Sequence, residues 1–289
     1  MLKKDSVFIV TKQNLYDAGD AIREKTGDSN LIPIKDMDDA ISDIPQGGGD
    51  SDLDALLTNS LESIRSNVTS LRNYALAKAS NIKSIEFPEL LTTGMNAFDE
   101  MHLTSVYLPK LTSAGNNTFS GCRWMTTVNL PSLTEVGTQV FQGCSALVDV
   151  NLPELLKTAA NAFRQCGLVE IVLPKVTELS GSTFYQCSSL QSVDLPVCTK
   201  ITSGQFYSAN NVIAIILRST AGVCVNEASE LFQSWSKIAS GTGFIYVPAA
   251  LIASYKSATN WARYESAFRA LEDYTVDGTT TGALDPNKV

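Results

Sequence analysis

The sequence predicts an α/β repeat solenoid, a chain wound into stacked turns with one short parallel strand in each turn. Two series of residues at a fixed spacing predict this fold. Prolines recur in steps of 21 or 22 residues, at Pro88, Pro109, Pro131, Pro153, Pro174 and Pro196. Phenylalanines repeat the same steps in the same order, at Phe98, Phe119, Phe141, Phe163, Phe184 and Phe206. Because a single turn cannot bury its own apolar side, such units are stable only when they stack.

The first half of each unit predicts a strand. Residues 103–109 read Leu-Thr-Ser-Val-Tyr-Leu-Pro, and the segments before the other prolines follow the same pattern. The alternation directs Val106 and Leu108 inward and Tyr107 outward. The proline lacks a backbone donor and ends the strand. Seven strands are predicted in this way, beginning at residues 82, 103, 125, 147, 168, 190 and 212.

The second half of each unit follows the proline and is predicted to carry the chain back along the opposite face. Residues 111–119 read Leu-Thr-Ser-Ala-Gly-Asn-Asn-Thr-Phe, and residues 133–141 and 176–184 are similar. Four cysteines stand three residues after a phenylalanine: Cys122, Cys144, Cys166 and Cys187. We predict that these four are buried free thiols that pack as small hydrophobic groups, and that Cys198 takes a leucine-type position.

Composition and charge divide the chain into modules. The net charge is -8, from 22 basic and 30 acidic residues, and residues 1–60 hold 12 acidic and 6 basic residues, which is -6 of that total. A neutral solenoid on an acidic adaptor is the simplest interpretation. The predicted modules are an N-terminal helical attachment module (1–46), a linker and short helix (47–66), the solenoid (67–217), a C-terminal cap (218–273) and a C-terminal tail (274–289).

Residues 1–46 predict two short amphipathic helices. Their apolar faces consist of Leu15, Ala18 and Ile22 in the first helix, and of Ile34, Met37, Ile41 and Ile44 in the second. Two such helices bury little surface, so we expect them to dock on a partner protein or on other copies of the chain. The run Gln-Gly-Gly-Gly-Asp-Ser at 46–51 predicts a flexible linker. Apolar residues from Leu53 to Ala75 also fit a heptad, which leaves a short capping helix and a coiled-coil stalk as alternatives.

No motif predicts an enzyme, a metal site or a bound cofactor. The single histidine, His102, excludes a histidine-rich metal cluster and is expected at the surface. The chain has no Cys-x-x-Cys pair, phosphate-binding glycine loop or nucleophile elbow, and the repeats hold no paired carboxylates at fixed positions. The sequence therefore predicts a non-enzymatic protein without cofactors.

Charge and hydropathy exclude two classes of partner. The acidic balance argues against binding to nucleic acid or to an anionic membrane surface. The longest apolar runs are too short for a transmembrane helix, and the N-terminus lacks the apolar stretch of a secretory signal. We therefore expect no nucleic acid and no membrane insertion, and synthesis in the cytoplasm without a signal peptide.

The pattern Leu-x-x-Val-x-Leu-Pro followed by Leu-Thr-x-x-Gly-x-x-x-Phe-x-x-Cys resembles the BspA-type leucine-rich repeat over roughly half of the chain. The resemblance implies a solenoid with a parallel sheet on its concave face, and an interaction module or adhesin. Residues 241–248 with Tyr255, Trp261 and Tyr264 are similar to the C-terminal strand–helix cap found with this repeat. In that cap the spacing of Trp261, Tyr264, Phe268 and Leu271 predicts one helical face against the last turn.

Both ends of the chain resemble phage proteins. Residues 11–44 look like an N-terminal module of tail and baseplate-associated proteins of phages and prophages of gut Firmicutes, and the tail from Tyr274 resembles tails of the same proteins. This implies a protein of the virion (phage tail), with residues 1–46 attached to other phage tail or baseplate proteins, and a trimer as in fibre-like proteins. The alternative is a bacterial BspA-like surface adhesin. From the tail sequence alone we expect only a turn at Asp277–Gly278.

The predicted recognition surface is the outward side of the strands. One strand position supplies its residues, which are Glu86, Tyr107, Asn129, Asn151, Val172, Asp194 and Ile216. Aromatic and amide side chains can bind a bacterial surface glycan or protein, so we expect one of these as the host receptor. The alternative is that this ribbon is only the solvated side of the solenoid.

Overall fold

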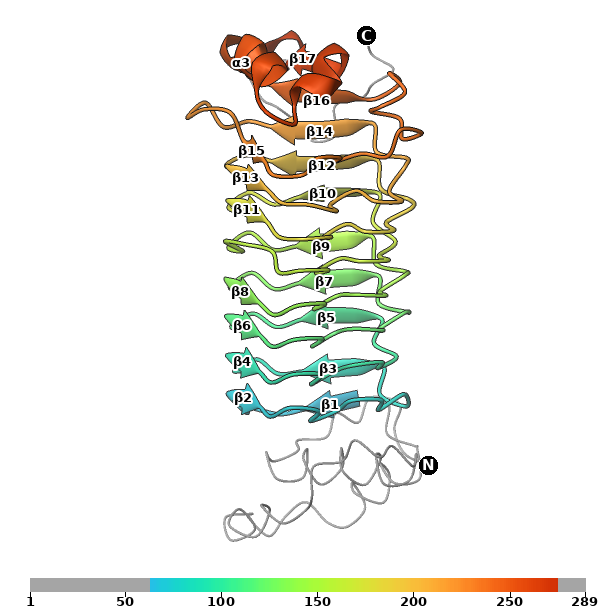
Figure 1. Cartoon of the computed structure of the whole chain (residues 1–289). Coiled ribbons are helices and arrows are strands. Elements are labelled where there is room, and N and C mark those ends of the chain that lie inside the picture. Colours follow the sequence, from blue (N-terminus) through green and yellow to red (C-terminus); the bar gives the residue numbers. More distant parts are fainter. Residues whose placement is uncertain (1–62, 275–289) are drawn as a thin grey trace, which may run out of the picture.

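The computed structural model of the protein describes residues 63–274. The helices predicted within 1–46, the linker at 46–51 and the turn at Asp277–Gly278 lie outside these residues. The described chain forms a parallel-strand solenoid of about nine turns, which stack in sequence order toward a C-terminal cap (Figure 1). The predicted fold class is confirmed.

Longer strands from successive turns lie side by side along one face, and all of their pairings are parallel (Figure 1). They form three sheets with the orders β1-β3, β5-β7-β9 and β10-β12-β14-β16-β17. Their bounds are β1 (Ser63–Arg65), β3 (Ser84–Glu86), β5 (Ser105–Tyr107), β7 (Thr127–Asn129), β9 (Asp149–Asn151), β10 (Glu170–Val172), β12 (Ser192–Leu195), β14 (Ala214–Leu217), β16 (Phe244–Val247) and β17 (Phe268–Ala270).

A second row of two-residue strands, which the sequence did not predict, follows the prolines. It forms the sheets β2-β4-β6-β8 and β11-β13-β15. The bounds are β2 (Ser70–Leu71), β4 (Thr92–Thr93), β6 (Ser113–Ala114), β8 (Glu135–Val136), β11 (Glu178–Leu179), β13 (Lys200–Ile201) and β15 (Val225–Asn226). Two residues are too few to show an alternating pattern, so hydrophobic periodicity could not find these strands.

The seven predicted strands form, and each begins two residues later than predicted. For example, β9 begins at Asp149, whereas the repeat suggested residue 147. The leading leucine instead closes the preceding turn, since the N–H of Leu147 donates to the carbonyl of Cys144 at 3.0 Å. Its side chain still points into the core, where Leu147 is fully buried.

The solenoid also begins earlier in the chain than predicted. Residues 47–66 were predicted as linker and helix, but Ser63–Arg65 form strand β1. Ile64 is buried and pairs in register with Ile85 of β3, 21 residues later. Ile64 therefore occupies the inward strand position of an additional turn, and residues 63–75 do not continue the heptad as a coiled coil.

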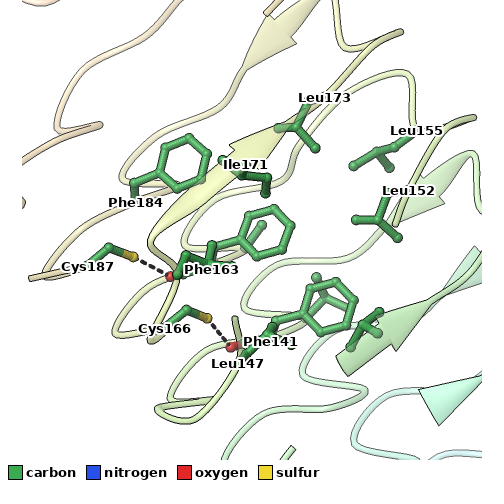
Figure 2. Close-up of a cluster of buried hydrophobic side chains, with 14 of the residues drawn as sticks. Phe141, Leu147, Leu152, Leu155, Phe163, Cys166, Ile171, Leu173, Phe184 and Cys187 are labelled. Carbon is green, nitrogen blue, oxygen red and sulfur yellow. Dashed lines mark hydrogen bonds between the residues drawn. The ribbon is translucent and has the colours of Figure 1, made fainter. Parts of the chain in front are cut away.

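One continuous apolar core runs along the solenoid from Ile64 to Phe268. Its main feature is the phenylalanine ladder, a column of buried, stacked rings whose neighbouring centroids lie 5.1 to 5.8 Å apart. Figure 2 shows three of these rings, Phe141, Phe163 and Phe184, one above the other. The ladder consists of Phe98, Phe119, Phe141, Phe163, Phe184, Phe206 and Phe232.

The backbone turns sharply on both sides of each ladder ring from Phe98 to Phe206. Asn161 and Gln165, which lie two residues before and two residues after Phe163, have φ values of 58° and 59°. Their N–H groups donate to the carbonyls of Gly181 and Tyr185 in the next turn, both at 2.9 Å. A left-handed backbone conformation is unfavourable for most residues. Here the two residues that adopt it gain hydrogen bonds to the next turn.

The cap differs from its prediction in one respect. Trp261, Tyr264, Phe268 and Leu271 are all buried, but they do not share a helix. The chain runs through η3 (Ala249–Leu251), α3 (Ile252–Ser257) and η4 (Ala262–Ala267) into β17, and ends in η5 (Leu271–Tyr274). β17 pairs with β16, and the helices supply the crossover that two parallel strands require. Pairing with β17 gives hydrogen-bond partners to the N–H and C=O groups at the edge of β16. This stabilises a strand at residues 268–270 more than the apolar spacing favours a helix there.

None of the helices within residues 63–274 has the length and apolar character that crossing a bilayer requires.

Candidate recognition surface

The structure brings the predicted surface residues onto one position of successive strands. Tyr107, Asn129 and Asn151 are consecutive partners in the sheet β5-β7-β9. Val172, Asp194 and Ile216 are consecutive partners in the sheet that begins with β10. Glu86 holds the same position in β3 and pairs with Arg65 of β1. The spacing of the repeat was sufficient to align all seven.

Five of the seven side chains are accessible to solvent. Tyr107 is 58% exposed and Val172 47%, Glu86 and Asn151 are exposed, and Asn129 is half-buried. The Asn151 Nδ2 donates to the Asn129 Oδ1 at 2.9 Å, so the two amides form a ladder. With Arg65, these residues define the strand ribbon: Arg65, Glu86, Tyr107, Asn129, Asn151 and Val172.

The other two predicted residues are buried, so the prediction that they face outward into solvent was wrong. Asp194 is 7% exposed, and its carboxylate accepts hydrogen bonds from the Arg218 Nε at 2.9 Å and Nη2 at 2.6 Å. Ile216 is 1% exposed and packs in a small cluster with Tyr246 and Leu271 of the cap. The ribbon therefore ends at Val172 because Arg218 and the cap cover its continuation.

A second exposed group, which the sequence patterns did not single out, lies where the chain approaches the strands. Trp124 is half-exposed, and its ring lies with its centroid 3.9 Å from that of His102. Val148 and Val169 are exposed on successive turns, at the position where earlier turns carry Thr104 and Thr126. The available signal was the change from Thr104 and Thr126 to two valines at the same repeat position.

The cysteine ladder is shielded rather than reactive. Cys122, Cys144, Cys166 and Cys187 are buried free thiols, as predicted. Each donates a hydrogen bond to a phenylalanine carbonyl of the previous turn, as Cys166 does to Phe141 at 3.0 Å (Figure 2). Burial raises the pKa of the Cys187 thiol to about 12 and raises the pKa of Cys122 and Cys166 as well. Protonated thiols are poor nucleophiles and poor metal ligands.

A surface cavity of about 410 Å³ lies where the second row of strands is interrupted between β8 and β11. Its lining includes one carboxylate, from Glu135, and one ammonium group, from Lys157. It therefore lacks the pair of carboxylates that glycoside hydrolysis commonly uses and the nucleophile–base pair of acyl transfer. Within the described residues, no three His, Cys, Asp or Glu side chains lie together as a metal site.

Comparison with known protein families gives a match over most of the described residues. Residues 58–160 and 155–240 match the model of the BspA type leucine rich repeat region, with six copies of the repeat. No curated protein matches the chain.

Solved structures of similar fold come from several bacteria. A leucine-rich repeat protein of Bacteroides ovatus is 18% identical with a TM-score of 0.40, over 66% of this chain and 63% of that protein. The leucine-rich repeat protein of T. pallidum is 22% identical with a TM-score of 0.43, over 58% of this chain and 85% of that protein. A leucine rich cell surface protein of Faecalibacterium prausnitzii is 16% identical with a TM-score of 0.35, over 57% of this chain and 66% of that protein. The chain thus matches less than two thirds of the Bacteroides ovatus protein.

Proposed function

Because the chain belongs to the BspA type leucine-rich repeat family, we propose that it is a non-enzymatic recognition protein whose strand ribbon binds a bacterial surface molecule. The observation that carries this proposal is the contrast between interior and ribbon. Interior positions repeat the same residue type from turn to turn, as in the phenylalanine ladder, whereas the ribbon carries acidic, aromatic, amide and apolar side chains in turn. Packing does not dictate the ribbon residues, so they can match a partner.

The chemistry of the ribbon suits a glycan or a protein surface. The exposed Tyr107 ring lies between Glu86, on the preceding long strand, and Asn129, its partner on the next strand. Aromatic rings stack on apolar faces, while carboxylate and amide groups exchange hydrogen bonds with hydroxyl or amide groups. The strands hold these side chains on a rigid backbone, which lowers the entropy lost on binding.

The proposed place of this protein is the tail or baseplate of a phage. Residues 1–46 attach the chain to other tail or baseplate proteins, and the solenoid presents the ribbon to a bacterial host, with three copies assembled as in fibre-like proteins. Support comes from the likeness of residues 11–44 to modules of phage tail proteins. A BspA-like adhesin on a bacterial cell is the second candidate, because the family match fits it equally well.

The ribbon is tested by the double variant Tyr107→Ala/Asn129→Ala. We expect the labelled full chain to bind intact gut Firmicutes cells, and the variant to bind at least about tenfold more weakly, because exposed aromatic anchors dominate binding energies. Flow cytometry over a concentration series measures this. Tyr207→Ala, an exposed tyrosine outside the ribbon, is the matched control and should bind like wild type. Equal binding by wild type and double variant would exclude the ribbon as the contact surface.

The proposed location of the protein in the phage tail is tested on purified phage particles. Mass spectrometry and immuno-electron microscopy are expected to find the chain at the tail, and phage lacking residues 1–46 of this protein should lose it from the particle. Detection on intact bacterial cells and absence from particles would instead support the adhesin. Retention in particles after the deletion would contradict the attachment role of residues 1–46.

A further inference from the structure

Cys198 and Cys224 form a thiol pair next to the cap. Both side chains are 1% exposed, and their sulfur atoms lie 3.9 Å apart. The pair is held by the parallel strands β13 and β15, since Cys198 lies two residues before β13 and Cys224 directly precedes β15. The N–H of Val225 donates to the carbonyl of Thr199 at 2.8 Å, which fixes the two segments against each other.

This pair differs from the cysteine ladder. Each ladder thiol donates to a phenylalanine carbonyl of the previous turn. In the pair, the Cys224 thiol donates to the Cys198 sulfur, and the Cys198 thiol donates to the Lys200 carbonyl at 3.3 Å. A disulfide requires the two sulfurs to approach to about 2.05 Å. The Cys198 and Cys224 sulfurs must therefore move together by only about 2 Å.

The hydrogen bond between the two thiols also makes them chemically unequal. It lowers the pKa of Cys198, which accepts the proton, and it raises the pKa of Cys224, which is also buried. A thiolate is the attacking species in thiol–disulfide exchange. Cys198 is therefore the thiol that attacks first, and Cys224 is the thiol that resolves the mixed disulfide.

We expect a reagent to reach the pair by local opening of the segment between β14 and β15, which leads directly into Cys224. Thr220 and Ala221 in this segment are exposed, and the backbone there forms neither helix nor strand. Irregular, partly exposed segments open at lower free-energy cost than regular turns, and such opening would admit a small reagent to the buried pair. The ladder thiols lie within regular turns, so we expect them to be opened less often.

We propose that Cys198 and Cys224 are a redox-active pair that closes to a disulfide on exposure to a low-molecular-weight disulfide such as oxidised glutathione. The Cys198 thiolate attacks one glutathione sulfur, forms a mixed disulfide and releases one glutathione, which takes up the proton lost from Cys198. The Cys224 thiolate then attacks the Cys198 sulfur and releases the second glutathione, which takes up the proton lost from Cys224. The protein loses two electrons, and glutathione disulfide gains them.

The disulfide between Cys198 and Cys224 would fix the cap to the solenoid. The backbone of Cys224 is already held by the cap, since its N–H donates to the Tyr255 hydroxyl at 2.9 Å and its carbonyl accepts from the Trp261 Nε1 at 2.6 Å. Cys198 belongs to the turn that follows β12. A covalent link between them resists opening of the capped end, which is the end that protects the apolar edge of the last turns.

The experiment incubates the folded full chain with oxidised glutathione at pH 8, followed by alkylation and digestion with trypsin and an Asp-specific protease. These enzymes release residues 194–200 and 219–237, each with one of the two cysteines. We expect these peptides to be recovered joined, with a mass two hydrogens below their sum, and the ladder cysteines to be recovered alkylated after unfolding. We also expect the thermal midpoint of the oxidised chain to exceed that of the reduced chain by about 5–10 °C.

Cys187→Ala is the matched control and should keep the joined peptides and the shift in the thermal midpoint. Cys224→Ser should lose both, and Cys198→Ala provides a second variant should the first fail to fold. Glutathione that remains on Cys198 in the folded wild-type chain, without joined peptides, would overturn the proposal. Joined peptides that include the ladder cysteines at similar yield would also overturn it.

Discussion

Phe163→Ala is expected to lower the free energy of unfolding by about 3–5 kcal/mol. Phe163 is fully buried in the middle of the ladder, with its ring centroid 5.3 Å from that of Phe141 and 5.8 Å from that of Phe184. Truncation removes apolar contact with both neighbouring turns and leaves a cavity between them. Each turn of a solenoid contacts only its neighbours, so the stack is interrupted at this point. Urea unfolding followed by circular dichroism measures the loss.

The control for this substitution is Tyr107→Ala, which removes an exposed ring of similar size from the strand ribbon. It should change the free energy of unfolding by no more than about 0.5 kcal/mol, as is usual for surface positions. Phe163→Leu, which keeps most of the apolar volume, should fall between the two. If Phe163→Ala cost no more than Tyr107→Ala, the stacked ring of Phe163 would not stabilise the neighbouring turns.

Trp261→Ala is the second substitution with a large expected effect, a loss of about 3–5 kcal/mol together with association of the chain. Trp261 is fully buried in the cap, and its Nε1 donates to the Cys224 carbonyl at 2.6 Å. Its ring also meets those of Tyr255 and Phe268 edge to face, at centroid distances of 5.8 and 5.9 Å. Loss of the indole loosens the cap and exposes the edge of the last turns, which is apolar and open to pairing.

Thermal unfolding, dye binding and size-exclusion chromatography measure these effects, which should appear as a lower midpoint, increased dye binding and larger particles. Trp235→Ala is the control, because it removes the same side chain from a site that is 65% exposed. It should leave all three measurements close to wild type. A monomeric Trp261→Ala chain with an unchanged midpoint would contradict the role assigned to the cap.

Most features that the sequence predicted correctly depend on the period of the repeat. A residue that recurs every 21 or 22 positions must occupy one place in successive turns, so a single aligned unit describes the whole column. This is why the phenylalanine ladder, the buried cysteines and the alignment of the ribbon could be predicted without coordinates. The prediction needed no pairwise contact, only the spacing.

The features that were missed or misplaced depart from the period. Strand β1 lies before the first clear repeat, and only its pairing with β3 reveals it. The cap has no repeat to align, so the spacing of Trp261, Tyr264 and Phe268 suggested a helix where the chain forms η4 and β17. There the unpaired edge of β16 determines the backbone, because its N–H and C=O groups need partners.

The candidate surface also has a part that the sequence predicted correctly and a part that it did not. Alternation along the strands predicts that Glu86, Tyr107, Asn129, Asn151 and Val172 face outward, and they are accessible. Alternation could not show that Arg218 would pair with Asp194, or that Leu271 would pack on Ile216, because both contacts join positions far apart in the chain. Burial of an outward side chain depends on what lies over it.

The period, the class of fold and the columns of side chains inside and outside the solenoid could be predicted from the sequence alone, because they follow from spacing along a chain that repeats. The first turn of the solenoid, the closure of the solenoid by the cap and the end of the exposed ribbon at Val172 became evident from the tertiary structure. The tertiary structure also brought Cys198 and Cys224 to within 3.9 Å of each other, two residues that the repeat does not relate. These are contacts between unlike segments, and their free energies depend on packing that no periodic pattern encodes.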